Sequence, residues 1–171
     1  HDPDSARRAL ISICDLENDS VRYLLADRLD SISGRMPNLA LEMHDKLAIT
    51  NDSSLISMLS SALASICAQR LEEYPSRAAH LISNGNDRSI RRLIESGFRT
   101  YLDYDPNDEQ GLLSHAWVEG DDLSKSRLKG LISEQRKISI DAFEATLRRI
   151  NAVSESEAIL LREEIMSRES R

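Results

Sequence analysis

The chain has 171 residues, of which 40% are hydrophobic and 30% charged, which allows a buried core and excludes a chain that is disordered throughout. Aromatic residues make up 4% and there are only 6 glycines, a composition that favours helices over sheets, since sheets are rich in aromatic and β-branched side chains. The formal net charge of -7 opposes nucleic-acid binding, whose affinity comes mainly from Lys and Arg.

The first predicted unit is a pair of helices over residues 3–33. Asp2-Pro3 favours a helix start, because a carboxylate can cap a helix and proline is tolerated at its first position. This helix is expected to end near Ile13, and the turn Asn18-Asp19-Ser20 is typical of a second helix start. The apolar stripe of the second helix has helical spacing and consists of Val21, Leu25, Leu29 and Ile32.

The same pattern returns along the chain. Further helix-start turns follow at intervals of 33 to 35 residues, as Asn51-Asp52-Ser53, Asn86-Asp87-Arg88 and Asp121-Asp122. The apolar stripe returns as Leu55, Leu59, Leu63 and Ile66, and then as Ile90, Ile94, Phe98 and Tyr101. A proline precedes three further first helices, as Pro37, Pro75 and Pro106. We therefore expect four more helix pairs, over about 36–71, 75–104, 106–135 and 138–169.

This repetition predicts one domain over residues 1–171, an all-α, right-handed α-solenoid of about five antiparallel helix pairs. One pair cannot bury its own apolar face, whereas stacked pairs can share a continuous core. The alternative is a plain helical bundle with a structural or dimerisation role, in which the repeat is coincidental. Because the chain begins at His1, we expect it to be part of a longer protein.

The segment Asp19-Ser20-Val21-Arg22 resembles the HEAT family of helical repeats, whose units carry a proline in the first helix and an Asp before a Val-Arg pair opening the second. The segment from Asp87 to Arg91 is similar with one residue inserted, while Ile56 stands where the second unit should have Arg. The resemblance implies a HEAT/armadillo-like superhelix with a broken Asp/Arg ladder. Bacterial DNA-alkylation-repair proteins are similar in being built of HEAT-like pairs, but their aromatic and acidic active-site pattern is absent here.

A modest basic strip is predicted on the second helices, where stacking would bring residues about 34 apart onto one surface. Helical repeats commonly bind partners on this inner, concave surface. The candidate partner contacts are Tyr23, Ser57, Arg91, Arg92, Arg99 and Arg127. The alternative is a solvated face with local ion pairs, such as Arg91 with Glu95 at i and i+4.

A second candidate surface is acidic, because no Lys or Arg occurs between Arg99 and Lys125. The acids in this window are Asp103, Asp105, Asp108, Glu109, Glu119, Asp121 and Asp122. Such a surface can steer a basic partner, although an acidic protein also forms clusters of this kind by chance. Its first part starts like a calcium loop, but Asp108 and Ser114 replace the required Gly and Glu, so helix capping is the preferred interpretation.

Three histidines, His44, His80 and His115, lie about 35 residues apart and are expected to align along the first helices. Stacked helices lie about 8 to 10 Å apart, too far for three imidazoles to bind one ion, so we predict no metal and no cofactor. Cys14 and Cys67 lie in apolar helical patterns, which indicates buried thiols in a reducing, cytoplasmic compartment.

The sequence lacks the signatures of catalysis and of membrane insertion. It has no glycine-rich phosphate loop and no nucleophile elbow, and no apolar run approaches the roughly 20 residues that span a bilayer. Trp117, the single tryptophan, is expected to fill the core.

The sequence therefore favours a non-enzymatic scaffold that binds a protein or peptide on its concave second-helix face. The alternative function is a nucleic-acid-binding, HEAT-like protein related to DNA-alkylation-repair glycosylases, using Arg91, Arg92, Arg99 and Arg127. The sequence gives no indication of the oligomeric state.

Overall fold

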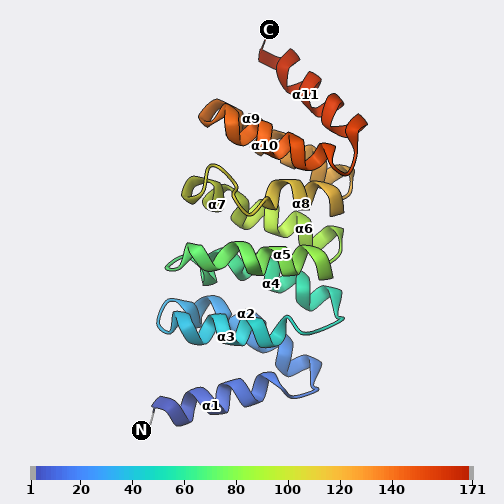
Figure 1. The fold of residues 1–171 in the computed structure, drawn as a ribbon. Helices are drawn as coiled ribbons and strands as arrows, with labels where there is room; N and C mark the ends of the chain where they lie inside the picture. Colours follow the sequence, from blue (N-terminus) through green and yellow to red (C-terminus); the bar gives the residue numbers. More distant parts are fainter. Residues whose placement is uncertain (1–2, 170–171) are drawn as a thin grey trace.

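A computed structural model describes residues 3–169 and confirms the predicted all-α class, because helices joined by turns make up this part of the chain and no strand occurs in it. Figure 1 shows the helices following one another in chain order, with the two chain ends at opposite ends of the molecule. The helices are α1 (Pro3–Cys14), α2 (Asp19–Ser33), α3 (Pro37–Leu47), α4 (Ser53–Ile66), η1 (Leu71–Glu73), α5 (Tyr74–Asn84), α6 (Asp87–Leu93), η2 (Ile94–Phe98), α7 (Arg99–Tyr104), α8 (Leu112–Glu119), α9 (Asp122–Ile138), α10 (Ile140–Asn151) and α11 (Glu155–Glu169).

These helices form two rows. The second row consists of α2, α4, the continuous helix α6–η2–α7, α9 and α11, and each of these contacts the next. In the first row α1 contacts α3, α5 contacts α8, and α8 contacts α10, whereas α3 and α5 approach each other less closely. Each first-row helix also contacts the second-row helix that follows it in the chain, so the two rows share one interior.

The turn signals in the sequence mark the starts of the second-row helices, as predicted. Asn18, Asp52, Asn86 and Asp121 are the N-cap residues. A side-chain oxygen of each accepts a hydrogen bond of 2.9 to 3.1 Å from a backbone N–H in the first helical turn. These bonds satisfy N–H groups that have no partner inside the helix, which is why short polar residues recur at these places.

The predicted helix start at Pro106 is wrong, because α8 begins only at Leu112. The Asp105 carboxylate does not cap a helix at Pro106; it accepts from the Tyr101 hydroxyl at 2.9 Å and the Glu109 backbone N–H at 2.9 Å. The chain then turns through two left-handed residues, Asp108 (φ 49) and Gly111 (φ 70). A left-handed backbone interrupts a right-handed helix, so the segment between Asp105 and Gly111 stays a turn.

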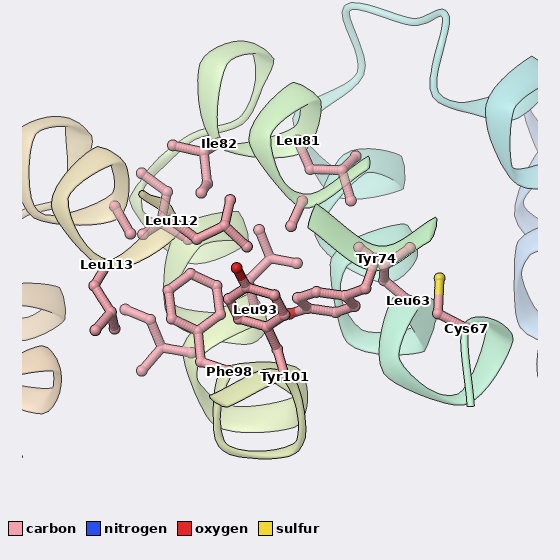
Figure 2. Close-up of a cluster of buried hydrophobic side chains, with 14 of the residues drawn as sticks. Leu63, Cys67, Tyr74, Leu81, Ile82, Leu93, Phe98, Tyr101, Leu112 and Leu113 are labelled. Atoms are coloured by element: carbon pink, nitrogen blue, oxygen red, sulfur yellow. The ribbon is translucent and has the colours of Figure 1, made fainter. Parts of the chain in front are cut away.

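The apolar stripes of the second row form one continuous core. The stripes of α4 and of α6–η2–α7 are fully buried, while Val21, Leu25 and Ile32 of α2 are only half-buried. The difference is expected for a helix near the end of the row, which has a neighbour on one side only. Figure 2 shows the middle of this core, where side chains from α4, α5, α6, η2, α7 and α8 meet.

Tyr74, the first residue of α5, lies where α5 and η2 approach each other closely in this core. Its ring stacks on that of Tyr101, with the centroids 5.7 Å apart, and lies against Gly97 in the π-helical turn η2. A Cβ atom at Gly97 would fall against the Tyr74 hydroxyl and within 2.7 and 2.8 Å of two ring carbons. The hydroxyl is buried and has no hydrogen-bond partner within the described residues. Gly97 is therefore required by a close approach between α5 and η2.

Polar contacts tie each second-row helix to the next in a ladder whose first members are 34 residues apart. Its four rungs join Tyr23 to Asp52 at 2.7 Å, Ser57 to Ser89 at 3.1 Å, Arg91 to Asp121 at 2.9 Å, and Lys125 to Glu157 at 2.8 Å. Of these four rungs only that of Arg91 and Asp121 pairs an Arg with an Asp, so the Asp/Arg ladder is interrupted. Other polar side chains make the remaining three rungs. The spacing of the rungs is similar to that of the helix-start turns in the sequence.

Candidate functional site

The exposed part of the predicted basic strip is a set of alternating charges on α6, η2, α7 and α9, which we call the arginine strip. It consists of Arg92, Glu95, Arg99, Arg127 and Glu134. Glu95 accepts from Arg92 at 3.2 Å and also pairs with Arg127, while Glu134 accepts from Arg99 at 2.8 Å. The strip therefore carries three cations and two anions on the surface of consecutive second-row helices.

The other three predicted contact residues are engaged inside the molecule. Ser57 is 5% exposed, so the prediction that it contacts a partner is wrong; its hydroxyl donates to the Ser53 carbonyl and bonds to Ser89. Tyr23 is half-buried and donates to Asp52. Arg91 pairs with Asp121 rather than with Glu95. All three side chains belong to the ladder and contact the next unit of the chain.

The predicted acidic surface is not one patch. Asp103, Asp105 and Glu109 precede α8, whereas Glu119 is its last residue and Asp121 and Asp122 follow it, so the helix, about 12 Å long, separates the two groups. The members Asp103, Glu109, Glu119 and Asp122 are exposed, and Asp105 and Asp121 are half-buried. The structure thus replaces one predicted surface by two small groups, each next to a turn.

Asp108 is also misplaced by the sequence-based prediction, because its side chain is fully buried. Its two carboxylate oxygens accept from the backbone N–H groups of Leu112, at 2.7 Å, and Leu113, at 3.1 Å, which start α8. Burial raises the pKa of this carboxyl group to about 6, although these two N–H groups, Arg149 and the Tyr101 hydroxyl all favour the ionised form. Asp108 thus binds the first N–H groups of α8 from a buried position, whereas the sequence predicted a solvated cap in this segment.

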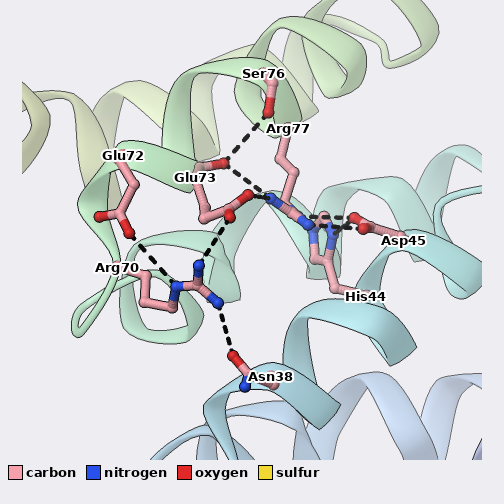
Figure 3. A network of polar contacts seen from close by, with 8 residues as sticks. All are labelled: Asn38, His44, Asp45, Arg70, Glu72, Glu73, Ser76 and Arg77. Atoms are coloured by element: carbon pink, nitrogen blue, oxygen red, sulfur yellow. Dashed lines mark hydrogen bonds and ion pairs between the residues drawn. The ribbon is translucent and has the colours of Figure 1, made fainter.

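A groove that the sequence does not reveal lies on the first row, between α3 and α5. It comprises two adjoining depressions of about 460 and 330 Å³, which share Asp45, Ile49, Glu73 and Arg77. Figure 3 shows the polar contacts across it. Arg77 of α5 donates from Nε and Nη2 to the two carboxylate oxygens of Asp45 on α3, at 2.8 and 2.7 Å. The groove is thus bridged by a two-point ion pair.

His44 lies beneath this ion pair and is 1% exposed. Neither of its ring nitrogens has a hydrogen-bond partner within the described residues, and Nδ1 lies 3.5 Å from the Asp45 carboxylate. Burial lowers the pKa of His44 from its usual value, because the charged imidazolium loses its hydration. The three predicted first-helix histidines differ in environment, since His80 is exposed and His115 is half-buried and bonds to Ser83.

Three features of the described residues bear on catalysis, metal binding and membrane insertion. Cys14 and Cys67 are free and buried, and burial raises the pKa of the Cys67 thiol to about 12, so it is not a reactive thiolate. Within residues 3–169 no three His, Cys, Asp or Glu side chains gather in a way that could hold a metal ion. Over the same residues, none of the helices has the length and apolar character to cross a bilayer.

Trp117 lies in the core of the fourth unit, as predicted, and is 4% exposed. Its indole N–H donates to Glu157 at 2.6 Å, so the ring also contributes to the contact between α8 and α11. Comparisons with models of known protein families, with curated proteins and with solved structures each find no match for this chain. Function must therefore be inferred from the residues themselves.

Proposed function

We propose that this chain is an α-solenoid scaffold of about five HEAT-like helix pairs, which binds a segment of another protein, or a peptide, along the arginine strip without catalysing a reaction. The observation that carries the proposal is the exposure of Arg92, Arg99 and Arg127 on consecutive second-row helices. A linear row of side chains on a repeating framework suits an extended or helical segment. The two-row arrangement and the ladder support the solenoid description.

The ion pairs of the strip make it suited to exchange partners. Exposed ion pairs contribute little to stability, typically about 0 to 1 kcal/mol, so Glu95 and Glu134 hold the arginines only weakly. Carboxylates of a partner can replace them with little loss to the fold, and a second desolvated contact to each guanidinium is a gain for the complex. The partner segment is therefore expected to carry Asp or Glu at intervals that match the strip.

Reversing charges in the strip should weaken partner binding. We expect Arg92→Glu and Arg99→Glu each to lower the affinity for a captured partner by about tenfold, equivalent to about 1.4 kcal/mol. Arg148→Glu is a matched control, because Arg148 is also exposed but lies on α10 in the first row. The measurement is capture of partners from a lysate by each immobilised variant, followed by titration of the purified partner. Retention of every partner by both strip variants would rule out the strip as the binding surface.

The same variants distinguish a protein partner from nucleic acid. Binding through about 6 phosphate contacts should weaken by something like a thousandfold between 50 and 200 mM salt. Because each strip arginine already faces a glutamate, we expect no such binding at low salt. A steep salt dependence abolished by Arg127→Glu would instead favour nucleic acid.

A cytoplasmic location is a further part of the proposal, supported by the two free thiols of Cys14 and Cys67.

A further inference from the structure

The junction between α3 and α5 differs from the other contacts of the first row, because the two helices approach each other less closely and polar side chains bridge the groove between them. Arg77 joins Asp45 at two points and also donates from Nη1 to the Glu73 carboxylate at 2.7 Å and carbonyl at 3.1 Å. At the other end of the groove, Arg70 donates to Asn38 of α3 at 2.7 Å. All three nitrogens of the Arg77 guanidinium are thus engaged, and its side chain is only 15% exposed. Closure of this junction depends on the Asp45 carboxylate.

His44, on α3, is a buried titratable side chain. Neither of its ring nitrogens has a hydrogen-bond partner within the described residues. Asp45 on its own helix and Arg77, Glu73 and His80 on the α5 side line the same depression. The charged groups named next, on the other helices that pack against α3, make contacts away from the ring. Arg7 of α1 and Asp15, which follows α1, pair with the half-buried α3 residues Glu42 and Lys46. On α2, Arg22 donates to the carbonyls of Leu47 and Ile49, while α4 has no charged residue and its N-cap Asp52 binds Tyr23.

We propose that protonation of His44 opens the junction between α3 and α5, so that mild acid loosens the stack at this one place. The geometry supplies the reason. A protonated Nδ1, 3.5 Å from the Asp45 carboxylate, competes with Arg77 for the same anion. A protonated Nε2 is a buried donor with no acceptor, which is unfavourable unless water reaches it. Opening the groove hydrates the ring and relieves both conflicts.

The direction of the pH dependence follows from burial. In the closed junction the pKa of His44 is lowered, so the neutral ring is favoured and its contribution to closure is fully present above the unperturbed pKa of about 6.5. That contribution is lost as the pH falls below 6.5 toward the lower pKa of the closed state. Within this window each pH unit favours the open junction by up to about tenfold. Asp45 stays ionised there, because, although burial opposes it, the nearby His44 ring and the hydrogen bonds from Arg77 lower the pKa of its carboxyl group.

Hydrogen exchange of the whole chain tests the proposal, with rates at pH 7.5 and pH 5 corrected for the intrinsic pH dependence of exchange. We expect protection of α3 and α5 amides to fall by about tenfold or more at pH 5, while protection of α9 and α10 is unchanged. His44→Leu, which fills the same space but cannot titrate, should abolish the fall. His80→Ala is the matched control, since His80 is exposed on the other side of the groove and its removal should leave the fall intact.

Two further measurements keep the test decisive if His44→Leu folds poorly. In the unaltered chain, the nuclear magnetic resonance titration of the His44 ring must have its midpoint below 6.5 and must coincide with the loss of protection in α3 and α5. Asp45→Asn should open the junction at both pH values, because the bridge from Arg77 loses its charge. Equal protection at both pH values in the unaltered chain, or an acid-dependent fall that survives in His44→Leu, would overturn the proposal.

Discussion

Replacing Gly97 by alanine should destabilise the protein by about 3 kcal/mol, at the upper end of the range for overpacked cores. The added methyl group would collide with the Tyr74 ring, whose carbons lie 2.7 and 2.8 Å from the position of the new Cβ. The ring cannot move aside easily, because it is 1% exposed and stacked on Tyr101. Urea denaturation followed by circular dichroism measures the change.

Tyr74→Phe identifies the cause of the Gly97→Ala effect. Because the Tyr74 hydroxyl is buried without a partner within the described residues, removing it should leave stability unchanged or raise it by about 1 kcal/mol. In the double variant the loss caused by Gly97→Ala should be smaller by about 1 kcal/mol or more, since the atom nearest to the new methyl group is gone. Strictly additive effects of the two substitutions would show that the collision is not with Tyr74.

Asp108→Ala should destabilise the protein by on the order of 3 to 4 kcal/mol. The substitution leaves the buried N–H groups of Leu112 and Leu113 without acceptors, each a loss of about 1 to 3 kcal/mol. It also places alanine at a left-handed backbone position, where aspartate and asparagine are better tolerated. Thermal and urea unfolding at pH 6 measure the loss, and a value near that of an exposed substitution, within about 0.5 kcal/mol, would contradict the capping role.

Asp108→Asn is the matched control, because it keeps one acceptor oxygen and tolerates the left-handed backbone. It should lose about half as much stability as Asp108→Ala, and it should change the pH dependence. The pKa of Asp108 in the folded chain is raised from 3.8 to about 6, so the folded state holds the proton more tightly. Its stabilising contribution is therefore present below pH 3.8 and is lost as the pH rises through about 6. The unfolding free energies of the unaltered chain and Asp108→Asn should therefore become more similar as the pH rises from 3.8 to about 6. A constant difference between them would be inconsistent with a raised pKa of Asp108.

Much of the fold could be predicted from the sequence, because periodicity encodes it directly. The apolar stripe from Leu55 to Ile66 and the caps Asp52 and Asn86 are local signals, since helical spacing and capping involve residues a few positions apart. The start of α8 was predicted too early because Asp105-Pro106 also looks like a helix start. Only the carboxylate of Asp108, which binds N–H groups four and five residues ahead, shows that the turn continues to Gly111.

The candidate site was less predictable, because its charges are paired across units. Arg99 with Glu134 and Arg127 with Glu95 are separated by 35 and 32 residues, close to the repeat length. Opposite charges at that spacing are a usable signal, yet the strip was predicted by stacking Tyr23, Ser57 and the arginines, without the glutamates that pair with them. The surroundings of His44 gave no such signal. What characterises them is that α3 and α5 provide no hydrogen-bond partner for the ring within the described residues.

The ladder that joins Tyr23, Ser57, Arg91 and Lys125 to the following units has a mechanical consequence. Every rung connects one unit only to its immediate neighbour, and within residues 3–169 the extensive helix contacts also join only the same or adjacent units. A force that pulls the two ends apart therefore acts on every contact between units, and the molecule lengthens by a small change at each of them. Bending should concentrate where α3 meets α5, because these first-row helices approach each other less closely than the others.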